Sequence, residues 1–178
     1  MREPSACISY WLPRLEESGV LIPKTVIVRT ELDLIPLLDG EMPEGFSLFL
    51  DQLTKAGDLM GWPMFLRAGH GSGKHNWERT CFVQGPAKLG SHVAAIVEWC
   101  CCADIFGFPT AVWAVREFLN LESLFTAYRG MPVNRERRYF FREGKLTCHH
   151  PYWPINAVKL GRPSREDWRP LLAELNRD

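Results

Sequence analysis

This sequence has no net charge: its 178 residues include 21 Lys and Arg against 21 Asp and Glu, and its pI is about 7.0. Proteins that bind nucleic acid usually carry a basic surface, because contacts with phosphates dominate their affinity. The neutral balance therefore counts against a nucleic-acid partner. Only a local arginine cluster, Arg135, Arg137, Arg138 and Arg142, favours one.

Long apolar runs are also lacking. No window reaches the roughly 18 apolar residues of a membrane-spanning helix. The first 19 residues contain neither the apolar core nor the small-residue cleavage site of a signal peptide. We therefore expect a cytoplasmic protein with no membrane partner.

Six cysteines are present, but they lack the spacing of a disulfide framework or a zinc knuckle. Three of them, Cys100–Cys102, are adjacent. The stretch Cys148–His150, with His70 and His75 upstream, fits none of the usual zinc patterns either. We expect reduced, mostly buried thiols and no zinc site.

Hydrophobic residues make up 46% of the sequence, which is enough to bury one real core. Repeats, low-complexity tracts and long linkers are absent. We expect one domain over residues 1–178 with two lobes, the first over about 1–110 and the second over about 111–178.

Hydrophobic periodicity predicts helices and strands joined by short connections. Helices are expected up to Ser18–Gly19, over Ser47–Met60, over Ser91–Asp104 with Ser91 as N-cap, and over Ser164–Asn176. Strands are expected over Lys24–Arg29, Pro63–Arg67, Arg79–Gln84 and Thr110–Leu119, and as a hairpin over Arg137–Arg142 and Lys145–His149. The hairpins favour antiparallel sheets, so the predicted fold class is α+β.

A glycine-rich loop, RAGHGSGKHNW over Arg67–Trp77, directly follows a predicted strand. It is not a P-loop, because Gly69 and Gly73 are one residue too close and His75 stands where a magnesium-binding hydroxyl is needed. Glycines still let backbone N–H groups approach an anion, and Arg67 and Lys74 could contact it. The alternative is a surface hairpin that happens to be rich in glycine.

Two later stretches could also bind a ligand. Val115–Asn120 is the end of an apolar strand, where exposed backbone groups could hydrogen-bond to a flat heterocycle such as adenine. An ordinary strand end has the same pattern. In Arg135–Phe141, strand alternation puts Glu136 and Arg138 on one face with Phe140. An arginine beside aromatic rings suits phosphate or carboxylate recognition, and the alternative is an exposed strand with salt bridges.

Taken in order, these segments resemble the ATP-grasp fold, in particular its phage and bacterial branch related to the eukaryotic cell-division-cycle chaperones that assemble a translation initiation factor. The resemblance covers about Tyr10 to Trp153. It rests on the order and spacing of five stretches: Tyr10–Leu15, Ile22–Thr25, Pro63–Arg67 with its loop, Val115–Leu119 and Glu136–Phe140.

The resemblance implies two α+β lobes with mainly antiparallel sheets and ATP bound between them with Mg²⁺. The residues that it matches to phosphate contacts are Arg67 and the loop residues His70, Gly71, Gly73 and Lys74. Those matched to adenine are Glu117, Phe118 and Leu119, with Glu122 a weaker candidate for the ribose. Arg138 is matched to the arginine that faces the transferred phosphate, with Glu136 beside it, so Lys74 and Arg138 become the catalytic candidates.

The activity implied is that of an ATP-dependent ligase that joins a carboxylate to an amine through an acyl phosphate, with an unidentified small-molecule or peptide acceptor. Such enzymes hold magnesium with an acidic residue and a Glu-x-Asn or Asp-x-Asn pair on late strands. Here only Glu174-Leu175-Asn176 spells that pair, within a helical pattern, so the metal ligands stay unassigned. Either the chain stops before its last strands, which we favour, or it is a non-catalytic nucleotide-binding module for assembly or interaction.

Overall fold

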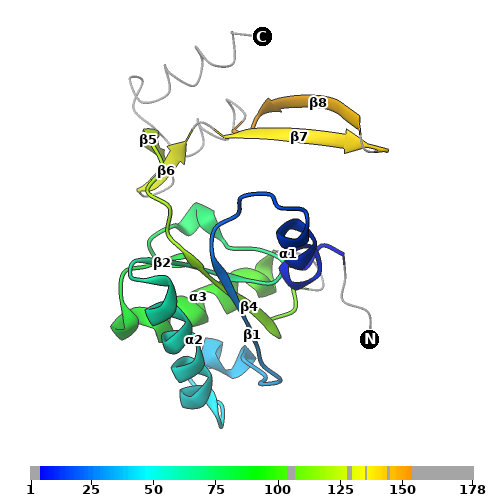
Figure 1. The fold of residues 1–178 in the computed structure, drawn as a ribbon. Helices are drawn as coiled ribbons and strands as arrows, with labels where there is room; N and C mark the ends of the chain where they lie inside the picture. Colours follow the sequence, from blue (N-terminus) through cyan, green and yellow to red (C-terminus); the bar gives the residue numbers. More distant parts are fainter. Residues whose placement is uncertain (1–4, 104–106, 128–129, 135, 144, 154–178) are drawn as a thin grey trace. The chain divides into compact units, whose positions relative to one another are not determined.

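The computed structural model describes residues 5–103, 107–127, 130–134, 136–143 and 145–153. The chain divides into two compact units, Met1–Leu119 and Asn120–Asp178, and each is described by itself (Figure 1). The sequence suggested a lobe boundary near residue 110. The first unit instead extends to Leu119, because the strand over Val112–Glu117 lies inside its sheet.

The first unit is built on a four-stranded sheet in the order β1-β4-β2-β3. Its strands are β1 (Thr25–Arg29), β2 (Met64–Ala68), β3 (Phe82–Val83) and β4 (Val112–Glu117). Every neighbouring pair is antiparallel. The α+β class with antiparallel sheets is therefore confirmed. The central position of β4 explains why Trp113, Ala114 and Val115 are all 0% exposed.

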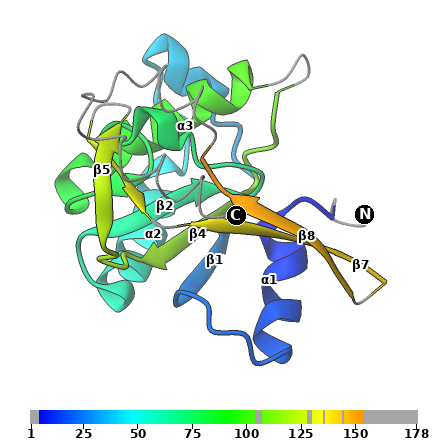
Figure 2. The same ribbon diagram turned by 90° about the horizontal axis from the view of Figure 1, so that it is seen from above.

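Helices cover both faces of this sheet (Figures 1 and 2). On one face, α2 (Phe46–Met60), α3 (Leu89–Cys102) and the 3₁₀ turn η1 (Ile35–Asp39) enclose the main core. The apolar residues of α2 recur every three or four positions, which directs one side of the helix to that core. On the other face, α1 (Ile8–Glu17) packs Ile8 and Leu12 against Ala114.

One glycine in α2 is required by packing. Gly57 is buried, and a Cβ there would lie 2.5 Å from Trp62 Cζ2 and 3.2 Å from Met64 Sδ. The Trp62 ring is held by a hydrogen bond from its Nε1 to Asp58 Oδ1 at 2.9 Å. The glycine therefore makes room for the ring where the helix meets the sheet.

We expect Gly57→Ala to destabilise the protein by about 1–2 kcal/mol, although alanine has the better helix propensity by about 1 kcal/mol. Overpacking against the Trp62 ring outweighs the propensity gain. Urea denaturation measures the change, with Gln52→Ala on the exposed side of α2 as a control for propensity alone. A more stable Gly57→Ala variant would contradict this packing.

The described residues of the second unit form two separate two-stranded antiparallel sheets. One pairs β5 (Ser123–Ala127) with β6 (Met131–Asn134), and it buries Phe125, Met131 and Val133. The other is the hairpin of β7 (Arg137–Arg142) and β8 (Lys145–Pro151), which confirms the predicted hairpin.

Two predictions about individual elements were wrong. The strand expected over Arg79–Gln84 is reduced to β3, because the N–H groups of Arg79 and Thr80 both donate to the Asn76 carbonyl and form a turn. Ser91 is not the N-cap of α3, since the helix already begins at Leu89 after the 3₁₀ turn η3 (Pro86–Lys88). The Ser91 hydroxyl donates to the Lys88 carbonyl instead. The helix predicted over Ser164–Asn176 lies outside the described residues.

Candidate functional site

The pairing of β2 with β4 brings two arginines to one face of the first sheet. Phe65 lies opposite Arg116, and Arg67 lies opposite Ala114. Residues opposite each other point to the same face, so Arg67 and Arg116 are diagonal neighbours on the face that α1 partly covers. We call this surface the arginine face, defined by Phe65, Arg67 and Arg116.

Arg116 is half-buried, and its Nε donates to Thr25 Oγ1 at 3.1 Å. Burial lowers the pKa of Arg116, while the neighbouring Glu117 carboxylate acts in the opposite direction. A guanidinium that is partly removed from water is stabilised when an anion or further acceptors replace the lost water. The position therefore suits a negatively charged ligand.

Four aromatic side chains cluster on this face: Phe65, Trp77, Phe82 and Phe118. Trp77 stacks on Phe82 with ring centroids 5.3 Å apart, and Phe118 meets Phe82 edge-on at 5.0 Å. Phe65 lies 5.9 Å from Trp77. Phe118 directly follows β4, so the cluster lies at the strand end that was predicted to read adenine.

The glycine-rich loop is packed against α3. A Cβ at Gly71 would lie 2.2 Å from Trp99 Cη2, and one at Gly73 would lie 3.1 Å from Trp99 Cγ. Gly73 also has φ +60°, a left-handed conformation that favours glycine. Packing thus gives these two glycines a structural role whether or not an anion binds.

Of the two cations predicted to bind phosphate, Arg67 lies at the start of this loop and Lys74 in its second half. Arg67, in β2, donates from Nε to the Ala68 carbonyl at 3.1 Å and from Nη2 to the Gly69 carbonyl at 3.4 Å. Lys74 begins the 3₁₀ turn η2 (Lys74–Asn76) and is half-buried. Desolvation lowers the pKa of His75, and the positive charge of Lys74 lowers it further.

Three other members of the predicted site, His70, Glu117 and Leu119, also lie in the first unit. His70 packs its ring 5.9 Å from that of Phe108, and its Nδ1 is buried with no hydrogen-bond partner within the described part of the chain. Glu117 is already engaged with Lys24: its backbone N–H donates to the Lys24 carbonyl, and its Oε1 accepts from the Lys24 N–H at 2.7 Å. Leu119 is 44% exposed.

The remaining predicted residues lie in the second unit. Glu122 is exposed before β5. Glu136 precedes β7, and its carbonyl accepts the Tyr152 N–H at 2.8 Å. The Arg138 guanidinium lies over the Tyr152 ring, 4.6 Å from its centroid. A cation–π contact of this kind orients the arginine without using its hydrogen-bond donors.

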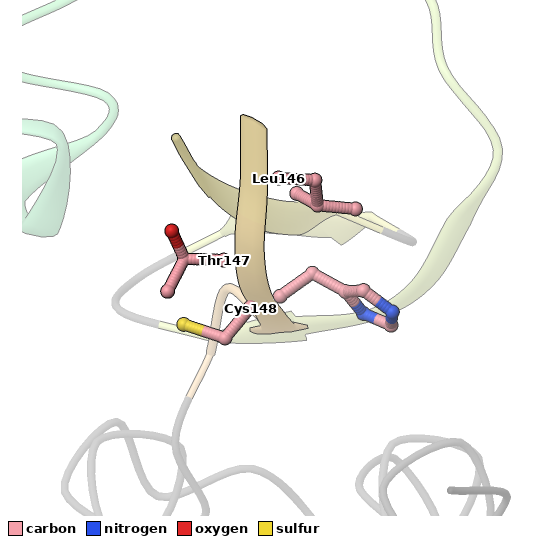
Figure 3. Close-up of a pocket in the computed structure, with 4 residues that line it drawn as sticks. Leu146, Thr147 and Cys148 are labelled. Atoms are coloured by element: carbon pink, nitrogen blue, oxygen red, sulfur yellow. The ribbon is translucent and has the colours of Figure 1, made fainter. Parts of the chain in front are cut away.

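A pocket on β8 is lined by Leu146, Thr147, Cys148 and His149 (Figure 3). These four consecutive residues come from one strand and include none of the predicted site residues. Among the described residues, no group of three or more His, Cys, Asp and Glu side chains could hold a metal ion. No helix in the described ranges has the length and apolarity to cross a membrane.

Comparisons with protein-family models, curated proteins and solved structures found no match to this chain. The candidate site therefore rests on its own geometry. Sequence reasoning missed Arg116 and Trp77 as site residues. Arg116 carried a signal, since it is a charged residue within an apolar strand, but only the pairing with β2 places it beside Arg67.

Proposed function

We propose that this chain binds ATP on the arginine face of the first unit, and that it is an ATP-grasp protein of the ATP-dependent carboxylate-amine ligase type. In that activity the γ-phosphoryl group of ATP is transferred to a carboxylate with release of ADP, and an amine then attacks the acyl phosphate and displaces inorganic phosphate. The acceptor is a small molecule or a peptide. The alternative is a module that binds ATP without turning it over.

The register of β2 and β4 carries this proposal. It puts two guanidinium groups, Arg67 and Arg116, beside a cluster of aromatic rings, and a nucleotide combines the matching chemistry of a flat base and an anionic chain. The half-buried position of Arg116 adds to this support, because an anion would offset its partial desolvation.

Roles for the individual residues follow from their chemistry. Arg67, Arg116 and Lys74 supply positive charge for the phosphates, and Phe118 supplies an apolar surface for the base beside the backbone groups of Leu119. His70 is matched to a phosphate contact by the resemblance, but its ring packs against Phe108 on the side of the main core and not on the arginine face. Arg138 and Glu136 belong to the second unit and remain predictions from the resemblance.

The described residues do not fit the magnesium site that the resemblance implies, because no three or more of their His, Cys, Asp and Glu side chains form a group that could hold a metal ion. What these residues could do is bind the triphosphate and orient it, and that is the part of the proposal open to a direct test.

Calorimetric titration of ATP, with and without Mg²⁺, into the full chain tests the proposal. The double variant Arg67→Ala, Lys74→Ala is expected to lose about 2 kcal/mol of binding free energy, or about 30-fold in affinity, because two charged donors are removed. The matched control Arg29→Ala, Lys55→Ala removes the same charge at exposed positions and should bind as the wild type does. Equal weakening in both double variants, or no binding by the wild type, would overturn the proposal.

Turnover separates the two forms of the proposal. Release of ADP or phosphate that depends on an added acceptor supports the ligase. ATP that binds and is recovered intact across a broad acceptor panel supports the binding module.

A further inference from the structure

A buried threonine closes the loop that carries Lys74. Thr80 is 1% exposed, and its hydroxyl lies 2.9 Å from both the Gly73 and the Asn76 carbonyl oxygens. A hydroxyl has one proton, so it is shared between these two acceptors. The Gly73 carbonyl directly precedes the η2 turn and the Asn76 carbonyl belongs to its last residue, and the Asn76 N–H also donates to the Gly73 carbonyl at 2.9 Å. The backbone on both sides of Lys74 is thereby fixed.

His92 in turn holds Thr80 from α3. His92 is 3% exposed, and its Nδ1 lies 2.7 Å from the Thr80 carbonyl. A carbonyl oxygen can only accept, so Nδ1 must carry the proton. Burial, chiefly, lowers the pKa of His92, which keeps the ring neutral with that proton in place. The side chain thus acts as a fixed donor.

The same helix also packs against the middle of the loop. Trp99 follows His92 by two helical turns, so both side chains project from one side of α3. Trp99 packs against Gly71 and Gly73, as the close approach of its ring to both glycines shows. Helix α3 therefore contacts the middle of the loop through Trp99 and, through His92, holds Thr80 just after the loop ends.

Beyond η2, the loop runs onto the arginine face. Trp77 comes directly after η2, and its ring lies 5.9 Å from Phe65, the residue opposite Arg116. The conformation that Thr80 fixes is therefore continuous with the surface that carries the two arginines.

We propose that Thr80 and His92 are positioning residues that hold the η2 turn in the conformation from which Lys74 contacts the phosphate chain of the ligand. This inference rests on the proposed function. It adds to that function the two residues that hold the loop in its binding conformation before the ligand binds. Holding the turn in advance lowers the entropy that binding must otherwise overcome. Neither residue touches the ligand.

The first test compares two probes that differ in the phosphates. Thr80→Val keeps the shape of the side chain and removes its hydroxyl. We expect it to weaken ATP binding about tenfold while the affinity for adenosine, which has no phosphate, stays unchanged. Thr80→Ser, which restores the hydroxyl, should recover the ATP affinity, and Thr54→Val in α2 serves as the matched control. Equal weakening of ATP and adenosine would overturn the positioning role.

The second test needs no ligand. Hydrogen exchange of the N–H groups of Asn76, Arg79 and Thr80 should be at least about tenfold faster in Thr80→Val than in the wild type, and protection should return in Thr80→Ser. If Thr80→Val does not fold, Thr80→Ala replaces it in both tests.

The two tests fail in different ways. Unchanged exchange in the variant overturns the positioning role and leaves the proposed function standing. Faster exchange in a chain whose wild type binds no ATP overturns the proposed function, and with it the role of the turn in phosphate binding.

Discussion

Replacing Trp113 with alanine is expected to lower the free energy of unfolding by about 3–5 kcal/mol, the range for removing a large aromatic side chain from a packed core. Trp113 is 0% exposed near the start of β4, and its ring meets that of Phe49 edge-on at 5.7 Å. Its Nε1 also donates to the Thr110 carbonyl at 2.6 Å. The substitution therefore leaves a cavity between β4 and α2 and removes a hydrogen bond.

Urea denaturation followed by far-ultraviolet circular dichroism measures this loss. Two further variants give stability changes with which this loss can be compared. Trp113→Phe keeps most of the apolar volume and should lose clearly less, whereas Leu21→Ala, at a side chain that is 99% exposed, should change stability by less than about 0.5 kcal/mol. A loss below about 1 kcal/mol for Trp113→Ala would contradict the central place of this residue in the core.

Elements with a strong local pattern were predicted well from the sequence. The helix expected over Ser47–Met60 differs from α2 by one residue, because its apolar periodicity is a property of the segment itself. The strand expected over Lys24–Arg29 likewise matches β1, whose β-branched residues favour extended backbone. In both cases the local preference agrees with the tertiary environment.

Elements that depend on distant partners were predicted less well. Arg79–Gln84 has a strand-like composition, but the buried Thr80 hydroxyl and the His92 ring hold its first half in a turn. The glycines of the loop were interpreted as an approach for an anion. They pack against Trp99, which belongs to a helix later in the chain, so no pattern within the loop predicts this contact.

In the candidate site too, features with a local sequence signal were predicted and features that depend on distant partners were not. The sequence alone singles out Arg67 and Lys74, because a cation beside glycines is a local signal. It does not show that Arg67 and Arg116 share a face, because that depends on which residues of β2 and β4 lie opposite each other. The role of α3 in holding the loop is tertiary information of the same kind.

Arg116→Met is expected to weaken ATP binding by about 2 kcal/mol, or about 30-fold, if the arginine face is the phosphate site. Methionine keeps the apolar stem and fills a similar space, so the main change is the loss of the guanidinium. Because burial already disfavours the charge of Arg116, this variant should be no less stable than the wild type in the absence of ligand. Binding and stability therefore change separately.

Calorimetry with ATP and urea denaturation of the free protein measure the two effects on the same samples. Arg29→Met, at the opposite end of β1 from the Thr25 partner of Arg116, is the matched control and should bind ATP as the wild type does. If Arg116→Met keeps full affinity, the anion does not contact this guanidinium. If it loses affinity and stability together, Arg116 supports the fold at the end of β4, and the phosphate contacts must come from Arg67 and the loop.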